Sequence, residues 1–182
     1  MSKRALILID IQNDYFDGGK WPLHGTDAAA RNAARVLAAA RQAGDTVVHV
    51  RHEFQGAEAP FFSAGSEGAR IHASVQPLEN EAVVLKHQVN AFRDTELKKL
   101  LDAAGIEQVT LVGAMSHMCI DAAARASADF GYVTTVIHDA CATRDQVFES
   151  QQVPAAQVQA AYMAALAFAY ADVVSTERYL AG

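Results

Sequence analysis

The most constraining feature of the chain is a series of short, continuous apolar runs. Runs of strand length cover residues 5–9, 46–50, 82–85, 109–112, 133–137 and 173–174. Apolar residues that follow one another, rather than alternate with polar ones, are typical of strands covered on both faces, as in a parallel sheet. Patterns typical of helices separate most of these runs. The sequence therefore predicts an α/β fold in which helices connect the strands of a parallel sheet.

Three segments between and after these runs show helix signals. The predicted helices run from Asp27 to Ala43, from Asp94 or Thr95 to Ala104, and from Pro154 to about Tyr170. Asp27 is a candidate N-cap of the first helix, and Gly44 and Gly105 follow the ends of the first two, where glycine is favoured. The third has proline at its first position, which suits a helix start, and is expected to be the final helix and to pack on one face of the sheet.

Two long segments, residues 13–26 and 53–77, contain glycine and proline and are predicted to be loops. Loops of this length within a compact domain are uncommon unless they are functional. Their aromatic residues are Tyr15, Phe16, Trp21, Phe54, Phe61 and Phe62. We expect these rings to form pocket walls or a lid at the sheet edge. For Trp21, Phe61 and Phe62, a satellite core or a subunit interface is an equally weighted alternative.

Composition limits the class of protein. With 182 residues, 51% of them hydrophobic and 20% charged, the chain is expected to form a single globular domain over residues 1–182. The net charge of −6 disfavours a nucleic-acid partner. The two cysteines are too few for a secreted disulfide scaffold, and the sequence shows no signal-peptide pattern, so we expect a cytoplasmic protein. No apolar run reaches the ~17 to 25 residues of a membrane span.

Three chemically reactive side chains follow predicted strands. Asp10 ends the first strand, Lys86 ends the third, and Cys119 follows the fourth after a glycine-containing turn. The carboxyl ends of parallel strands meet at one sheet edge, where ligands bind. A thiol needs a base and a cation to act as a nucleophile, and an ammonium ~4 Å away at a dielectric of ~20 contributes on the order of 4 kcal/mol. We therefore expect the pKa of Cys119 to be lowered by about two or three units.

Each of these residues also has a purely structural interpretation. A lone cysteine is more often a small buried hydrophobe, which is the interpretation we give Cys141. Asp10 alone is compatible with a turn residue, and Lys86 alone with a solvated charge. The coincidence of three such residues at three strand ends favours the catalytic interpretation.

Four motifs in succession resemble those of the isochorismatase-like cysteine hydrolases, and in particular the streptothricin-hydrolase-like and nicotinamidase-related members. The motifs are LIDIQNDYF at residues 8–16, VLKH at 84–87, GAMSHMCID at 113–121 and HDACAT at 138–143. The resemblance spans nearly the whole chain. It implies a three-layer α/β/α sandwich around a six-stranded parallel sheet of order 3-2-1-4-5-6. By position, it implies a catalytic triad of Asp10, Lys86 and Cys119.

The resemblance also carries expectations about mechanism. It implies a cis peptide bond between Ala114 and Met115, and an oxyanion hole formed by the backbone amides of Met115 and Cys119. It implies hydrolysis of an amide in a small molecule through a thioester on Cys119, without a cofactor, in a homo-oligomer, a dimer or tetramer. The candidate substrate-binding residues are Phe16, Trp21, His52, Phe92 and His117. For His52 and His117, a structural or solvent-facing role is an alternative.

The chain departs from some relatives. Nicotinamidases bind a metal through an Asp-x-His pair after the second strand, whereas this chain has Arg51, His52 and Glu53 there, so we expect no metal. True isochorismatases tend to lack the cysteine, so Cys119 favours covalent amide or ester chemistry. Two other functions stay open: a non-catalytic binding scaffold, and a peroxide sensor in which Cys119 forms a disulfide with Cys141.

Overall fold

The computed structural model describes residues 3–56 and 58–182, and its centre is a parallel sheet. The sheet has six strands in the order β3-β2-β1-β4-β5-β8, and every neighbouring pair is parallel. The strands are β1 (Arg4–Ile9), β2 (Thr46–His52), β3 (Ala82–Lys86), β4 (Gln108–Ala114), β5 (Val133–Ala142) and β8 (Asp172–Val174). All six predicted strands are present. The predicted order is confirmed, with β8 as the sixth strand of this sheet.

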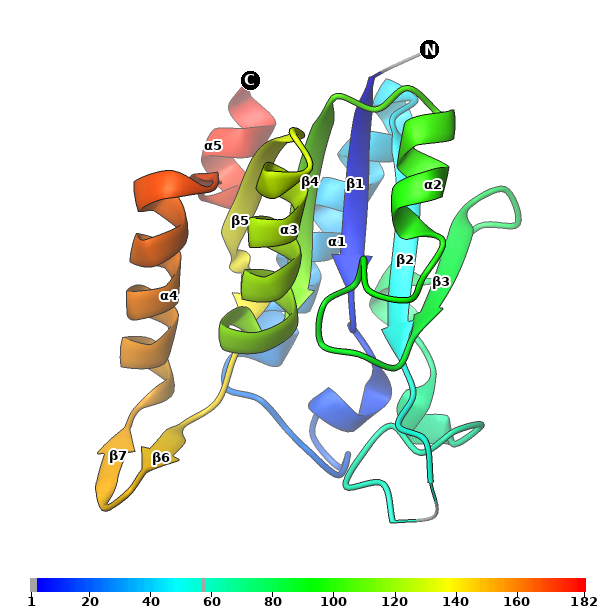
Figure 1. Cartoon of the computed structure of the whole chain (residues 1–182). Coiled ribbons are helices and arrows are strands. Elements are labelled where there is room, and N and C mark those ends of the chain that lie inside the picture. The colour runs from blue at the N-terminus through cyan, green and yellow to red at the C-terminus, as the bar shows by residue number, and fades with distance from the viewer. Residues whose placement is uncertain (1–2, 57) are drawn as a thin grey trace.

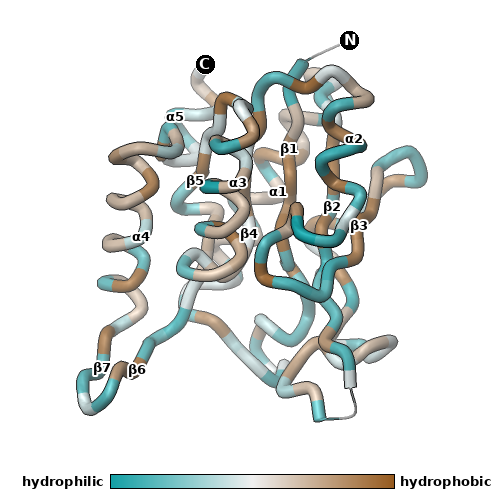
Figure 2. The backbone as a smooth tube through the Cα atoms, viewed as in Figure 1, coloured by the Kyte–Doolittle hydropathy of each residue, from teal (hydrophilic) through white to brown (hydrophobic). Residues whose placement is uncertain are grey.

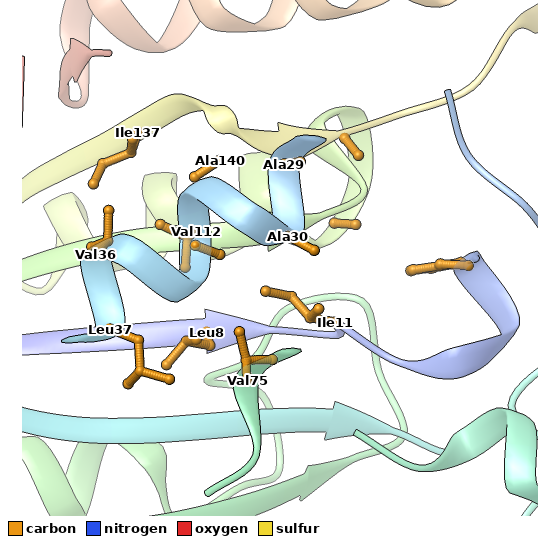
Figure 3. Close-up of a cluster of buried hydrophobic side chains, with 14 of the residues drawn as sticks. Leu8, Ile11, Ala29, Ala30, Val36, Leu37, Val75, Val112, Ile137 and Ala140 are labelled. Atoms are coloured by element: carbon orange, nitrogen blue, oxygen red, sulfur yellow. The ribbon is translucent and has the colours of Figure 1, made fainter. Parts of the chain in front are cut away.

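Helices cover both faces of the sheet (Figure 1). They are α1 (Thr26–Ala43), α2 (Leu97–Ala103), α3 (Asp121–Asp129), α4 (Ala155–Ala169) and α5 (Thr176–Ala181). On one face, Val36 and Leu37 of α1 pack on Leu8, Val112 and Ile137 (Figure 3). On the other, α2, α3 and α4 bury a second apolar cluster. The predicted three-layer α/β/α sandwich is therefore confirmed.

Several predicted helix boundaries are wrong by a few residues. Gly25 is the N-cap residue of α1, so Asp27 lies in the first turn rather than at the cap. Asp94 has a left-handed backbone with φ 56°, which prevents helix there, and α2 begins at Leu97 and ends at Ala103. Pro154 is the N-cap residue of α4, and α5 follows α4, so α4 is not the final helix.

A hairpin that the sequence analysis missed precedes α4. It consists of β6 (Gln146–Phe148) and β7 (Gln151–Val153), which pair antiparallel outside the main sheet. Figure 1 shows it extending away from the sheet. Val147 and Phe148 are 67% and 72% exposed, so neither strand buries an apolar face that would have identified it from the sequence.

The two aromatic loops lie beyond the carboxyl edge of the sheet (Figure 1). Within them are three short 3₁₀ turns, Asn13–Tyr15, Glu67–Ala69 and Ala73–Val75. The buried carboxylate of Asp14 accepts hydrogen bonds from the backbone amides of Phe62 (2.7 Å) and Lys20 (3.1 Å), which ties the loops together. Phe61 and Phe62 are buried within the chain itself, as the satellite-core alternative predicts.

The outer side of α4 is apolar and exposed. Figure 2 shows mainly tan and brown turns along this helix, interrupted by short teal stretches, and Phe168 is 92% exposed. Across residues 3–56 and 58–182, no helix combines the length and hydropathy that a membrane crossing requires. The homo-oligomer and the cytoplasmic location stay predictions.

We predict that Gly113→Ala strongly destabilises the fold. Gly113 has φ 127°, and a Cβ there would lie 1.9 Å from the carbonyl oxygen of Ile9 on the neighbouring strand. Clash and backbone strain together are expected to cost about 3 to 5 kcal/mol in the free energy of unfolding, measured by urea denaturation. The matched control is Gly44→Ala, where φ is also positive but no atom lies within 4 Å. Equal losses in the two variants would contradict the prediction.

Candidate active site

Three strand ends bring Asp10, Lys86 and Cys119 together. Asp10 directly follows β1, Lys86 is the last residue of β3, and Cys119 lies in the turn between β4 and α3. Although β2 separates β1 from β3, the long lysine side chain reaches across to the aspartate. Asp10 and Lys86 are fully buried, and Cys119 is 6% exposed.

The ammonium of Lys86 connects the other groups. Its Nζ lies 2.8 Å from Asp10 Oδ2 and 3.3 Å from Cys119 Sγ. It also lies 3.0 Å from His52 Nδ1 and 3.2 Å from the carbonyl oxygen of Gln88. Burial opposes the charged form of Lys86, but the attraction of Asp10 and Cys119 outweighs burial, so the pKa of Lys86 is raised. The lysine is therefore a permanent cation with four acceptors around its three protons.

The thiol of Cys119 is protonated in this site, which corrects the expected low pKa. Burial raises the pKa of Cys119, the charge of Asp10 and a hydrogen bond to Asp10 raise it further, and Lys86 only partly offsets them, giving about 12. The sequence-based prediction treated burial and the Asp10 charge as smaller effects than the lysine, whereas the depth of burial decides the direction of the pKa shift. The carboxylate of Asp10 is thus placed to accept the thiol proton.

The backbone at Asp10 holds this carboxylate in place. Asp10 has a left-handed conformation with φ 53°, and its amide donates a hydrogen bond of 2.9 Å to the carbonyl of Val50. Such a conformation is uncommon for a residue other than glycine and is found at functional sites when the surroundings enforce it. Within the described residues, Asp10 Oδ1 has no hydrogen-bond partner. One carboxylate oxygen is therefore available for a proton.

The turn that carries Cys119 follows the peptide bond between Ala114 and Met115, which is cis. Residues Ser116–Ile120 form a wide π-helical turn, in which the carbonyl of Met115 accepts hydrogen bonds from Met118 and Ile120. The backbone amide of Cys119 lies between those of Met118 and Ile120 in the chain. It is at the start of a helix, where backbone amides lack helical hydrogen-bond partners. π-turns are frequent at functional sites.

The five candidate substrate-binding residues lie in different surroundings. Phe16 is buried, stacks on His72 and lines a small cavity together with Asp10. His117 lies half-buried, 2.7 Å from the hydroxyl of Thr143, and Trp21 stacks on Phe61. Phe92 is buried in the same apolar cluster as Cys119, and its ring packs on Phe130 and Tyr132.

His52 contacts the triad directly. Burial, and then the charge of Lys86, lower the pKa of His52 to about 4, so the ring is neutral near pH 7. Because the ammonium of Lys86 donates to Nδ1, we assign the ring proton to Nε2, which is buried and has no hydrogen-bond partner among residues 3–56 and 58–182. His52 therefore supports Lys86 and presents one unused donor.

Gln12, which the sequence analysis did not select, and Tyr15, which it named among the loop aromatics, also shape the site. The side-chain amide of Gln12 donates to the carbonyls of His52 (2.9 Å) and Ala69 (2.8 Å), and its oxygen accepts from the amide of His52. Tyr15 is buried, and after burial the charges of Cys119 and Asp10 further raise the pKa of its hydroxyl. Both belong to the first motif, and a side-chain amide three residues after the end of β1 was the available signal for Gln12.

No cluster of three or more histidine, cysteine or acidic side chains suited to a metal ion occurs in residues 3–56 and 58–182. Arg51 and Glu53, which flank His52, form an ion pair with each other. The reactive groups that the strand ends bring together are a thiol, a carboxylate and an ammonium.

We predict that Asp10→Asn makes Cys119 easier to ionise. Removing the carboxylate removes a charge that raises the thiol pKa, and each unit by which the pKa falls gives about tenfold more thiolate at a fixed pH. Iodoacetamide alkylation of Cys119, mapped by mass spectrometry from about pH 6 to pH 11, should accelerate in the variant. Cys141 is the internal control, because it is equally buried and Asp10 does not affect its pKa. Parallel acceleration at both thiols would indicate general loosening and contradict the prediction.

Comparisons with known proteins agree with this architecture. The family model described as the isochorismatase domain matches residues 4–177. A solved structure from Oleispira antarctica, described as a candidate isochorismatase hydrolase, is 60% identical, covers 98% of this chain and 96% of its own, and has a TM-score of 0.95. An uncharacterised isochorismatase family protein of Bacillus subtilis is 47% identical over 97% of this chain and 98% of its own length.

Two relatives have named hydrolase activities. The streptothricin hydrolase of Streptomyces noursei is 36% identical over 78% of this chain and 50% of its own length. The maleamate amidohydrolase of Pseudomonas putida is 33% identical over 78% of this chain and 73% of its own length. The family expected from the four motifs is confirmed, and the chain belongs to the isochorismatase family of hydrolases.

Proposed function

We propose that the protein is a cysteine amidohydrolase that cleaves the C–N bond of a small-molecule amide through a thioester on Cys119. The observation that carries this proposal is the contact of one ammonium, Lys86 Nζ, with both Asp10 Oδ2 at 2.8 Å and Cys119 Sγ at 3.3 Å. A nucleophile, its base and a fixed cation are the groups that covalent acyl transfer needs. The names of the two hydrolase relatives support the same reaction class.

In the first half of the reaction, the thiol proton passes to Asp10 as the sulfur attacks the amide carbonyl carbon. Because the pKa of Cys119 is raised to about 12, proton transfer accompanies the attack rather than precedes it. The backbone amides of Met115 and Cys119 donate hydrogen bonds to the developing oxyanion, and one such donor is typically worth about 3 to 4 kcal/mol. The C–N bond then breaks, and the leaving amine takes the proton from Asp10.

In the second half, water replaces the amine. The Asp10 carboxylate removes a proton from this water as its oxygen attacks the thioester carbon. The C–S bond breaks, the acid leaves, and the proton returns from Asp10 to the sulfur. Lys86 stays charged throughout and balances whichever of the two groups is anionic.

The two alternative functions, a peroxide sensor and a non-catalytic binding scaffold, differ in what they require of the Cys119 thiol. A peroxide sensor requires a thiolate, and the raised pKa of Cys119 and of Cys141, both due first to burial, counts against that role. Non-reducing electrophoresis after mild peroxide treatment tests it. A binding scaffold has no need for a base and a cation around a thiol, which the site provides.

We predict that Cys119→Ala lowers amide turnover by about 10³-fold or more, because no nucleophile replaces the sulfur. Lactams, carbamoyl compounds and small primary amides are the substrates to screen, with release of ammonia or amine as the measurement. A brief quench into acid, followed by mass spectrometry, should show an acyl adduct on Cys119 in the unmodified protein. Cys141→Ala is the control and should keep full turnover. Turnover that survives Cys119→Ala would contradict the thioester mechanism.

A further inference from the structure

The side chain of Gln159 joins helix α4 to the turn that carries Cys119. The buried residues of α4 are apolar: Ala155, Val158, Met163 and Leu166. Gln159 lies half-buried on the same helix. An amide in such surroundings is unfavourable unless its hydrogen bonds are made. Both ends of the Gln159 amide have partners, and neither partner belongs to α4.

These partners determine which way the Gln159 amide points. Its nitrogen Nε2 donates to the carbonyl oxygen of His138 on β5 at 2.8 Å. We therefore assign its oxygen Oε1 to the opposite side, where it accepts a hydrogen bond from the hydroxyl of Ser116 at 2.5 Å. The Ser116 hydroxyl also lies 3.2 Å from the carbonyl oxygen of Ala142, the last residue of β5. One side chain thus connects α4, β5 and the turn at Ser116.

Ser116 is fully buried and begins the π-helical turn that carries Cys119. It directly follows Met115, whose backbone amide is one of the two proposed oxyanion donors. One helical turn beyond Gln159, the ring of Tyr162 meets the ring of His117 edge-on at 6.0 Å. Helix α4 therefore packs directly against this turn (Figure 1).

We propose that Gln159 is a positioning residue, which holds the turn at Ser116 so that Cys119 meets a substrate carbonyl in the geometry that attack requires. This inference rests on the proposed thioester reaction. The sulfur and the backbone amide of Cys119 move together with the turn, and a displacement of about 1 Å at a reacting centre can lower a rate about 100-fold. Because Gln159 acts through Ser116, it affects the rate of acyl transfer more than the binding of substrate.

Acylation by p-nitrophenyl acetate tests the inference with a defined probe. Attack of Cys119 on the ester carbonyl releases p-nitrophenolate, whose absorbance gives the rate constant of acylation. Gln159→Met keeps the length of the side chain and removes both hydrogen bonds. It should lower this rate constant by about 10- to 30-fold and change the half-saturating ester concentration by less than about threefold. Gln157→Met is the matched control and should change neither, because Gln157 is exposed on the same helix.

A double-mutant cycle tests whether the effect passes through Ser116. Ser116→Ala alone should cause a loss similar to that of Gln159→Met, and the double variant should lose no more than either single variant. Three results would overturn the proposal: an undiminished rate constant in Gln159→Met, an equal loss in Gln157→Met, or losses that multiply in the double variant.

Hydrogen–deuterium exchange separates this inference from the proposed reaction. In Gln159→Met, the backbone amides of Ser116–Ile120 should exchange about tenfold faster or more, whereas those of α1 should keep their rates. Unchanged exchange in this turn, or equal acceleration in α1, would overturn the inference whether or not Cys119 is acylated. If Cys119→Ala releases p-nitrophenolate as fast as the unmodified protein, the thioester reaction fails, and the exchange rates alone decide whether Gln159 holds the turn.

Discussion

The contact of Lys86 with two groups that can each carry a negative charge is the interaction on which the site depends. Asp10 and Cys119 are both buried, and two adjacent anions there would be strongly unfavourable without a cation. One ammonium balances one negative charge, so the site holds one proton between the carboxylate and the sulfur. The raised pKa of the thiol keeps that proton on the sulfur in the absence of substrate.

The fold makes this contact possible through small local features at the sheet edge. Gly113 allows β4 to approach the carbonyl of Ile9, which brings the turn with Cys119 next to Asp10. Gln12 binds the backbone of His52 on β2, and His52 in turn accepts a hydrogen bond from Lys86. These contacts connect the first four strands, β1 to β4, at the point where the reactive groups meet. The core clusters below the site keep the strands in register.

The sequence predicted the parts that follow from periodicity and topology. Continuous apolar runs identified every strand of the main sheet, and the parallel arrangement placed the strand-end residues Asp10, Lys86 and Cys119 on one edge. The direction of the Cys119 pKa was wrong, because the depth of burial depends on how residues distant in the chain pack over the sulfur. The β6–β7 hairpin was missed for a different reason, because its exposed strands bury no apolar face that a sequence pattern could reveal.

A protonated, buried thiol suits this chemistry better than a free thiolate would. A permanent thiolate is open to oxidation and alkylation at all times, whereas a thiol that ionises only during attack is protected between turnovers. The unfavourable burial of the thiolate is relieved when the negative charge moves from sulfur to the substrate oxygen, where backbone amides can receive it. Burial thus raises the energy of the free thiolate without raising that of the oxyanion to the same extent. In the proposed reaction, Asp10 takes up the thiol proton during this transfer, so the total charge of the site stays constant while Lys86 keeps its positive charge.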